Sequence, residues 1–362
     1  MSEQETSQET TLEGATPVRE EDAFDLDAVR RWLATEGTEL GEHVEVQQFG
    51  GGASNLTYSL RDGTHDLILR RPPAGQKAKG AHDMTREHRV QEGLAGVFPL
   101  VPRMVALCLD ESVIGAQFYV MERVDGLIPR RDFPPGVDLD EAQVRQLCTN
   151  ALDVLVDLHA VDVDATPLAA MNKGDGYVER QVSGWSRRFR DARTDDVGDY
   201  EEVMGWLEEH RPADVGHCLI HNDFRFDNLV LDRDDPTRVV GVLDWEMATV
   251  GDPLMDLGGT LGYWVQADDD EFFLGFRRQP TTAPGMLTRQ EVVDYYLERT
   301  GRTLSPEQWR FYEVFGLFRL GVIAQQIYYR YFHGQTTNEV YAGFGPAARY
   351  LEQRCRAIIA AG

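Results

Sequence analysis

The stretch HNDFRFDNLVLD, residues 221–232, places several polar side chains immediately before an apolar strand. His221, Asp223 and Asn228 have the spacing H-x-D-x4-N, and Asp244 ends the second apolar run, RVVGVLD. The turn-rich sequence RDDPT joins the two runs, so the pattern predicts a β-hairpin. A hairpin brings the polar loop and Asp244 to the same end of a small sheet.

Oxygen ligands at this spacing suit Mg²⁺, which takes the rest of its coordination shell from water and phosphates. The spacing is that of the kinase catalytic loop and its magnesium aspartate. The alternative is that Asp223, Asp227 and Asn228 only close Asx-turns before a strand. Because Asp244 lies on the hairpin partner, the catalytic interpretation is favoured.

The three segments HNDFRFDN, VLDWE and GDPLMDLG resemble the aminoglycoside phosphotransferase and choline kinase-like family. Four further segments are similar to the kinase-like domains associated with acyl-CoA dehydrogenases: FGGGASNLTY, LILRRPP, DESVIGAQFYVMERVDG and AQQIYYRYFHGQT. The resemblance covers nearly the whole chain after its N-terminal tail. It implies a small-molecule kinase that uses ATP and Mg²⁺.

By this resemblance, Asp223 is the catalytic base, and Asn228 and Asp244 are the magnesium ligands. His221 is expected to hold the loop rather than take part in the chemistry. Asp256, in GDPLMDLG, is expected to brace the loop through backbone hydrogen bonds.

Two other loop positions need separate interpretation. Arg225 stands where protein kinases keep a lysine near the transferred phosphate, and the alternative is a surface arginine. Asn222 stands where the family usually has glycine, and it either alters the turn or contacts the substrate.

The expected ATP-binding strands begin with a glycine-rich turn. Gly51 and Gly52 allow backbone N–H groups to approach phosphate oxygens, and Ser54 and Asn55 add side-chain donors. Without the downstream motifs, the same turn would indicate a plain hairpin.

The next strand is expected to carry a lysine paired with a helix glutamate, and the sequence offers Arg70 and Glu87 instead. An Arg–Glu pair is bidentate and can still contact phosphates, although arginine and lysine are not interchangeable. Lys77 and Lys79 are alternative phosphate contacts. The remaining possibility is that Arg70 and Glu87 are ordinary surface charges.

The segment YVMERVDG supplies a strand that leads into a connection between lobes. By resemblance, the Glu122 carbonyl and the Val124 N–H group hydrogen-bond the adenine ring. These are backbone roles, so side-chain identity supports them only weakly.

At 362 residues the chain exceeds the usual size of one core, which predicts two lobes. We expect an α+β, bilobal protein-kinase-like fold with an N-terminal antiparallel sheet lobe and a larger helical C-terminal lobe. The predicted parts are a disordered acidic tail at 1–24, an ATP-binding lobe at 25–125 and a catalytic, substrate-binding lobe at 126–362.

The composition excludes several classes of protein. The net charge of −25 disfavours binding to nucleic acid or to an anionic membrane surface. The chain has no long apolar run and no basic-then-apolar leader, so we expect a soluble, cytoplasmic protein. Its four cysteines form no CxxC pair, which argues against a zinc site.

The predicted activity is phosphorylation of a hydroxyl group on a small molecule, because no protein-kinase activation segment follows VLDWE. A hydroxyacyl-CoA is the alternative acceptor. Two other functions stay open: a nucleotide-binding regulator without transfer activity, and a metal-dependent phosphohydrolase. The sequence leaves the oligomeric state open.

Overall fold

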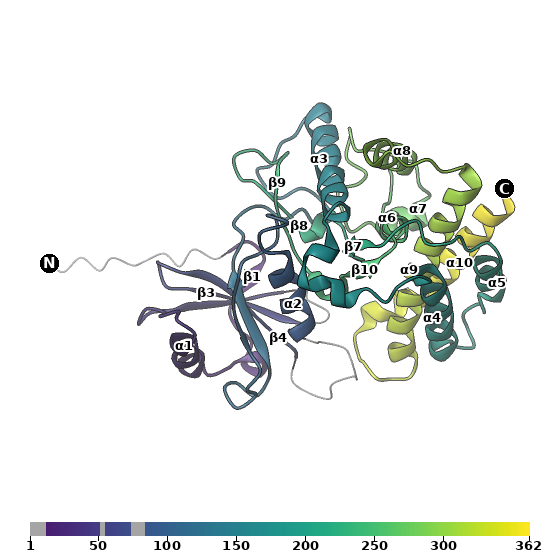
Figure 1. Ribbon diagram of the computed structural model, residues 1–362. Helices are drawn as coiled ribbons and strands as arrows, with labels where there is room; N and C mark the ends of the chain where they lie inside the picture. The colour runs from purple at the N-terminus through teal and green to yellow at the C-terminus, as the bar shows by residue number, and fades with distance from the viewer. Residues whose placement is uncertain (1–11, 51–54, 74–83) are drawn as a thin grey trace. The chain divides into compact units, whose positions relative to one another are not determined.

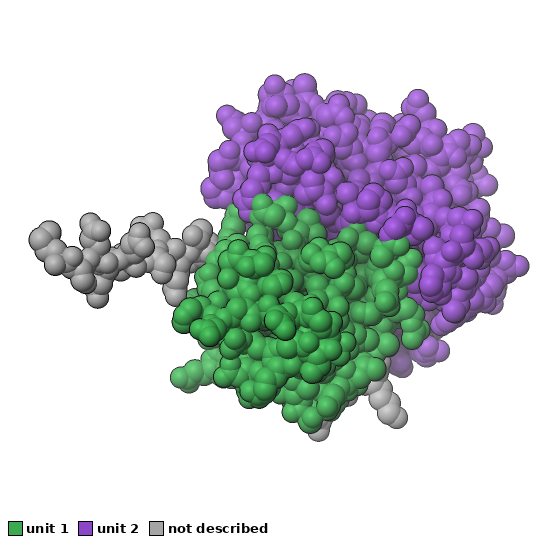
Figure 2. Space-filling view, turned by 60° about the vertical axis from the view of Figure 1, so that its left-hand side comes forward, with its two compact units in different colours: residues 1–95, 101–125 green, residues 96–100, 126–362 purple. Residues whose placement is uncertain are grey.

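The computed structural model describes residues 12–50, 55–73 and 84–362 (Figure 1). The chain divides into two compact units (Figure 2). Unit 1 comprises residues 1–95 and 101–125, and unit 2 comprises residues 96–100 and 126–362.

Unit 1 contains an antiparallel sheet whose strand order is β1-β2-β3-β4-β6-β5. Three successive strands, β2, β3 and β4, precede Pro72, and residues 51–54 of the glycine-rich segment between β2 and β3 lie outside the described residues. The strands are β1 (Ala15–Thr16), β2 (Glu45–Phe49), β3 (Leu56–Arg61), β4 (Asp66–Arg71), β5 (Met104–Cys108) and β6 (Phe118–Glu122).

One helix covers each face of this sheet (Figure 1). Helix α1 (Leu26–Thr35) packs Val29 and Leu33 against Leu69 of β4. Helix α2 (Met84–Leu94) packs Met84 against the opposite face, where Ile68 is buried. Because side chains alternate along β4, Ile68 and Leu69 serve different helices, and the sheet is buried on both sides.

The disordered tail predicted for residues 1–24 is wrong for its described end. Strand β1 pairs with β2 in the register Ala15 to Phe49, and Asp22 is buried. The Asp22 carboxylate accepts hydrogen bonds from Gln48 Nε2 at 2.8 Å and from Arg19 Nε at 2.7 Å. The polar composition misled the prediction, because sheet pairing and hydrogen bonds order this segment although few apolar side chains are buried.

One strand of the N-terminal sheet was also misplaced. The segment ESVIGAQFYVMERVDG has the pattern of two short strands on either side of Ile114 and Gly115, but ESVI is a turn. It is closed by a 2.7 Å hydrogen bond from Gly115 N to Glu111 O, with Gly115 at φ 78°. The partner of β6 is instead β5, which starts two residues after Pro102. Glycine adopts this φ without strain, which is why the chain turns there.

Residues 96–100, expected in the N-terminal part, belong to unit 2. The Leu100 carbonyl accepts a hydrogen bond from Val242 N at 2.8 Å. The ring of Phe98 meets Trp245 edge to face, with centroids 5.9 Å apart. These contacts fix the segment against the end of the strand Val239–Val242 and the turn that follows it.

Unit 2 is largely helical and contains two short β-ribbons. Strands β7 (Cys218–Ile220) and β10 (Thr249–Gly251) form one ribbon, and β8 (Leu229–Leu231) and β9 (Val239–Val242) form the other. The helices are α3 (Glu141–His159), α4 (Tyr177–Ala192), α5 (Glu201–Glu209), α6 (Pro253–Gly262), α7 (Glu271–Gly275), α8 (Arg289–Thr300), α9 (Pro306–Phe332) and α10 (Phe344–Ala360).

Helices α6 and α9 pack closely through glycine. A Cβ atom on Gly258 would lie 2.5 Å from the Tyr312 carbonyl oxygen, and one on Gly262 would lie 2.8 Å from the Gly316 carbonyl oxygen. Both distances are shorter than real Cβ contacts, so the glycines permit this approach. The packing fixes α6, whose first turn supports the candidate active site.

All four cysteines are buried: Cys108, Cys148, Cys218 and Cys355. Burial raises the pKa of the Cys148 thiol to about 12 and raises the pKa of each of the other three. Within the described ranges, none of the helices combines the length and apolar character needed to span a membrane.

Candidate active site

The loop of residues 221–228 connects β7 to β8, and the predicted hairpin of β8 and β9 is confirmed. Leu243 N donates a 2.8 Å hydrogen bond to Asn228 O, which ties the end of β9 to the start of β8. Asp244 follows Leu243 directly. The hairpin therefore brings Asp244 to the polar loop, as its sequence pattern predicted.

Asp256 braces this loop from the first turn of α6, which confirms its predicted structural role. Its carboxylate is 1% exposed and accepts the N–H groups of His221 and Asn222, both at 2.7 Å. His159 Nε2 lies 3.1 Å from the same carboxylate. Burial alone would raise the Asp256 pKa, but the hydrogen bond and charge of His159, together with the backbone hydrogen bond of His221, lower it.

His221 is a structural link within the loop. Its buried ring accepts a hydrogen bond from Asp223 N at Nδ1 (3.2 Å) and donates from Nε2 to Leu243 O (3.0 Å). These partners assign the proton to Nε2. The ring thus joins the residue before Asp244 to the backbone of Asp223, and its predicted holding role is confirmed.

Asn222 and Asp244 have left-handed backbone conformations, with φ values of 64° and 67°. Among non-glycine residues, Asn and Asp are enriched in this region. Asn222 Nδ2 also donates to Met247 O at 3.1 Å. Asn222 therefore makes the turn for which the family usually has glycine.

Asp223 and Asn228 lie in direct contact. Asn228 Nδ2 donates to the Asp223 carbonyl at 2.8 Å and to Asp223 Oδ2 at 3.1 Å. With Nδ2 so engaged, Asn228 Oδ1 is the atom that a metal ion would use. The oxygen atoms of Asn228 and Asp244 are the hard donors that Mg²⁺ prefers, so the residues fit this ion.

Arg225 is held between two carboxylates and an aromatic ring. Its Nη2 atom lies 3.3 Å from Asp223 Oδ2 and 3.3 Å from Asp227 Oδ2, and its guanidinium carbon lies 4.7 Å from the Tyr263 ring centroid. Burial lowers the Arg225 pKa, but Asp223 and Asp227 outweigh it, so the net shift is upward. Arg225 is therefore a partly buried cation of the loop rather than a surface arginine, and its contact with phosphate stays a prediction.

Asp227 and Arg319 were missed as parts of this site. Asp227 was read only as a turn residue, yet burial raises its pKa and its carboxylate contacts Arg225. Arg319 donates from Nη2 to the Asn222 carbonyl at 2.6 Å and is 6% exposed. Its signal was present, because a single cation interrupts the apolar run FGLFRLGVIA.

In unit 1, the predicted pairing of Arg70 with Glu87 is confirmed. Arg70 Nη1 donates to Glu87 Oε1 and, at 3.3 Å, to the Tyr119 hydroxyl. Glu87 is 1% exposed, so the pair is buried. The contacts of this pair with phosphate stay a prediction.

The structure says less about the other residues that the sequence predicts to bind nucleotide. Gly51, Gly52, Ser54, Lys77 and Lys79 lie outside the described residues, and Asn55 is buried just before β3. Glu122 ends β6, and its side chain pairs with Arg103. Val124 makes no hydrogen bond to any residue that the structure describes. Its N–H group is thus available for the predicted adenine contact.

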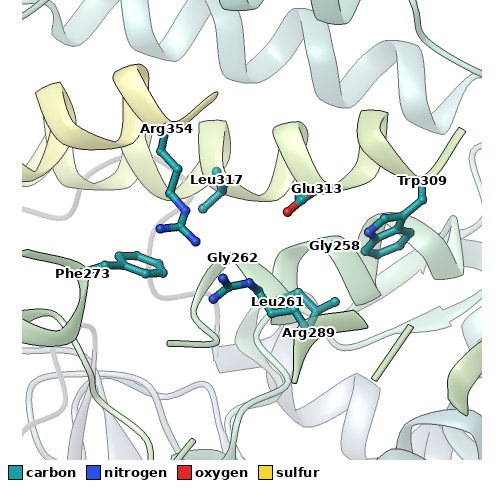
Figure 3. A pocket seen from close by; sticks show the side chains of 9 residues that line it. All are labelled: Gly258, Leu261, Gly262, Phe273, Arg289, Trp309, Glu313, Leu317 and Arg354. Carbon is teal, nitrogen blue, oxygen red and sulfur yellow. The ribbon is translucent and has the colours of Figure 1, made fainter. Parts of the chain in front are cut away.

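A separate cavity is too small for a substrate. It lies beside α6, α9 and α10, and its enclosed space of about 20 Å³ suits one water molecule. Arg289 and Arg354 line it (Figure 3), and both bind Asp269, at 2.6 and 2.8 Å. Both arginines here already have a carboxylate partner.

One cluster in unit 2 has metal-ligand geometry but a structural explanation. Donor atoms of Asp175, Asp214 and His217 lie within 4.8 Å of one another. The Asp214 carboxylate accepts the N–H groups of Tyr177 at 2.9 Å and Val178 at 2.9 Å. It therefore serves as the cap of α4.

Comparison with known proteins identifies the family. A model of the phosphotransferase enzyme family matches residues 45–291, which include the loop of residues 221–228, Asp244 and Asp256. The chain belongs to the phosphotransferase enzyme family. It is 35% identical to acyl-CoA dehydrogenase family member 10 of Mus musculus over 89% of the chain and 30% of that protein. It is 32% identical to family member 11 of Homo sapiens over 91% of the chain and 42% of that protein.

The chain thus spans less than half the length of these curated relatives. Among solved structures, a Ralstonia eutropha JMP134 protein assigned as an aminoglycoside phosphotransferase is 30% identical, with a TM-score of 0.78 over 93% of this chain and 98% of its own. Choline kinase of Cryptosporidium parvum is 12% identical, with a TM-score of 0.61 over 92% and 95%. These likenesses confirm the kinase-like α+β fold predicted from the sequence.

Proposed function

We propose that this phosphotransferase-family protein transfers the terminal phosphoryl group of ATP to a hydroxyl group of a small molecule, with Mg²⁺ as cofactor. The main support for this proposal is the catalytic loop, in which Asp223 contacts Asn228. The β8–β9 hairpin brings Asp244 to the same loop. A related aminoglycoside phosphotransferase was solved with AMP-PNP and hygromycin B, at a TM-score of 0.58 and 17% identity. That complex supports nucleotide binding by this fold.

In the proposed mechanism, Asp223 orients the acceptor hydroxyl and accepts its proton. Asn228 and Asp244 would hold Mg²⁺, which neutralises charge on the phosphates when bound. Arg225 adds a fixed cation next to Asp223, and Arg70 supplies a second one in unit 1 for the nucleotide phosphates. Positioning and charge neutralisation account for most of the catalysis in this chemistry.

The short connection after Asp244 favours a small acceptor. Only β10 separates the turn at Trp245–Met247 from α6, which starts at Pro253. A protein kinase uses a long segment at this point to bind and select a protein substrate. The chain has no room for one here.

A hydroxyacyl-CoA is a second candidate acceptor. The curated relatives are acyl-CoA dehydrogenase family members, and the chain is 30% to 35% identical to those compared. A kinase domain joined to such a dehydrogenase would act on a related acyl compound. The aminoglycoside acceptors named for solved neighbours belong to proteins less similar in sequence, apart from the Ralstonia protein.

Phosphoryl transfer can be tested by incubating the protein with ATP, Mg²⁺ and a panel of hydroxyl compounds, followed by mass spectrometry of the products. We expect one class of compound to gain a phosphoryl group, with loss of at least about 100-fold in Asp223→Asn. Asp164→Asn, an exposed change of the same chemistry, is the matched control. Phosphate release without a phosphorylated product would favour a phosphohydrolase. Tight ATP binding without turnover would favour a regulator.

A further inference from the structure

Two arginine side chains lie over the same tryptophan ring next to the catalytic loop. The guanidinium carbon of Arg188 lies 4.6 Å from the Trp185 ring centroid, and that of Arg319 lies 5.4 Å from it. The indole N–H group is already used, since it donates to Gln181 Oε1 at 3.1 Å. Gly259 makes room for Arg319, because a Cβ atom there would lie 2.9 Å from Nη1. All these residues belong to unit 2.

Neither arginine has an acidic partner among the residues that the structure describes. Burial, followed by the charges of Arg187 and Arg319, lowers the Arg188 pKa. Elsewhere in unit 2, Arg289 and Arg354 both bind the carboxylate of Asp269. Arg319 is 6% exposed, and a buried cation without a carboxylate partner is unfavourable unless an anion compensates it. Arg188, which is exposed, adds a second like charge on the same ring.

The pair lies beside the proposed catalytic base. Arg319 Nη2 donates to the carbonyl of Asn222, the residue before Asp223. In the described residues this is the only hydrogen bond from Arg319, so its other N–H groups remain for a ligand. Two carboxylates of the catalytic loop region already have partners, because Asp223 contacts Arg225 and Asp256 binds His159.

We propose that Arg188 and Arg319, placed by Trp185, bind an oxyanion of the acceptor, either a carboxylate or a phosphate group. This inference rests on the proposed kinase function and narrows its substrate class to anionic alcohols. Guanidinium groups match both oxyanions in geometry and remain charged. A polycationic aminoglycoside would meet two like charges here and is disfavoured.

Anion binding can be measured without knowing the acceptor. Sulfate represents the tetrahedral anion and malonate the carboxylate, each titrated by calorimetry at constant ionic strength, without nucleotide or Mg²⁺. Losing one charge-assisted contact weakens binding by about tenfold or more. We therefore expect at least about tenfold weaker binding in Arg188→Gln, for sulfate, malonate or both, and less than about twofold change in Arg187→Gln.

Arg187 is the matched control because it is adjacent in α4, exposed and of equal charge, and stacks on no ring in the described chain. Arg319→Lys is the second variant, since it keeps a charge at the Asn222 carbonyl and loses the fork geometry. Equal effects of Arg188→Gln and Arg187→Gln, or no binding of either anion to the wild type, would overturn the inference. The preferred anion identifies which oxyanion the acceptor carries.

A kinetic comparison then connects the subsite to turnover. Matched acceptors are glycerol against glycerol 3-phosphate, and 1,3-propanediol against 3-hydroxypropanoate. We expect a preference for the anionic member that Arg188→Gln removes through KM for the acceptor, with KM for ATP unchanged. Transfer that favours the neutral members refutes the inference and leaves the proposed function intact. Arg188-dependent anion binding with no phosphoryl transfer to any acceptor refutes the proposed function instead.

Discussion

Replacement of Asp256 by asparagine tests whether a buried carboxylate holds the catalytic loop. The carboxylate accepts three donors, from His159 and from the backbones of His221 and Asn222. Asparagine has one acceptor oxygen, and its amide nitrogen would face another donor. At least one buried donor is therefore left without a partner in Asp256→Asn.

The expected loss of stability follows from these contacts. Each hydrogen bond to a buried charged group contributes about 1.5 to 3 kcal/mol, and one or two are lost. We expect the free energy of unfolding of unit 2 to fall by about 1.5 to 6 kcal/mol. The exposed control Asp164→Asn should change it by less than about 0.5 kcal/mol.

Tryptophan fluorescence during urea unfolding suits this measurement, because Trp185, Trp206, Trp245, Trp264 and Trp309 all lie in unit 2. Phosphoryl transfer is measured on the same samples. It should fall in Asp256→Asn even where the protein stays folded, because the backbone before Asp223 loses its anchor.

The pH dependence separates the carboxylate from a general packing defect. His159 and His221 hold the Asp256 pKa below its usual value of about 4. The stabilisation that the ionised Asp256 carboxylate provides is therefore fully present above pH 4. It is lost as the pH falls through the lowered folded-state pKa. The difference between wild type and Asp256→Asn should thus be largest near pH 7 and shrink below pH 4. A difference below 0.5 kcal/mol at pH 7, or one of equal size at pH 3, would refute the reasoning.

Three further predictions concern backbone conformation, helix packing and the nucleotide. Asn222→Gly should change the free energy of unfolding by less than about 1 kcal/mol in the same urea assay. Asn222→Val should lower it by about 2 kcal/mol or more, because a β-branched residue is strained at φ 64°. Gly258→Ala should lower the melting temperature, because its Cβ would lie 2.5 Å from the Tyr312 carbonyl oxygen. The control Gly184→Ala in α4 should raise the melting temperature slightly, because a Cβ there would meet nothing within 4 Å. Arg70→Met should raise KM for ATP by about tenfold or more while kcat falls less, and an unchanged KM would contradict the proposed phosphate contact.

The hairpin and the loop were predictable because their signals are local. Two apolar runs around RDDPT fix the hairpin, and the hairpin fixes where Asp244 lies. The brace from Asp256 was predicted through the family resemblance, and the structure adds the buried contact with His159, which is distant in sequence. No local pattern could indicate that contact, since it depends on how α3 packs near α6.

Other features were missed because their causes are tertiary. Strand β1 has only two residues, and its pairing with β2 is fixed by the sheet edge rather than by its own composition. The role of Arg319 depends on α9 packing beside the loop. Asn222 could be interpreted only from its left-handed φ in the structure, because sequence alone left both a turn and a substrate contact open.

Because all four cysteines are buried, the native protein should react little with thiol reagents. A thiol reacts as the thiolate, and a pKa of about 12 at Cys148, with raised values at the others, leaves almost none of that form at neutral pH. A cysteine introduced at an exposed position should therefore take up a maleimide probe alone, with no native cysteine replaced. Paired probes, one in each unit, would report how the separation of the two units responds to ATP.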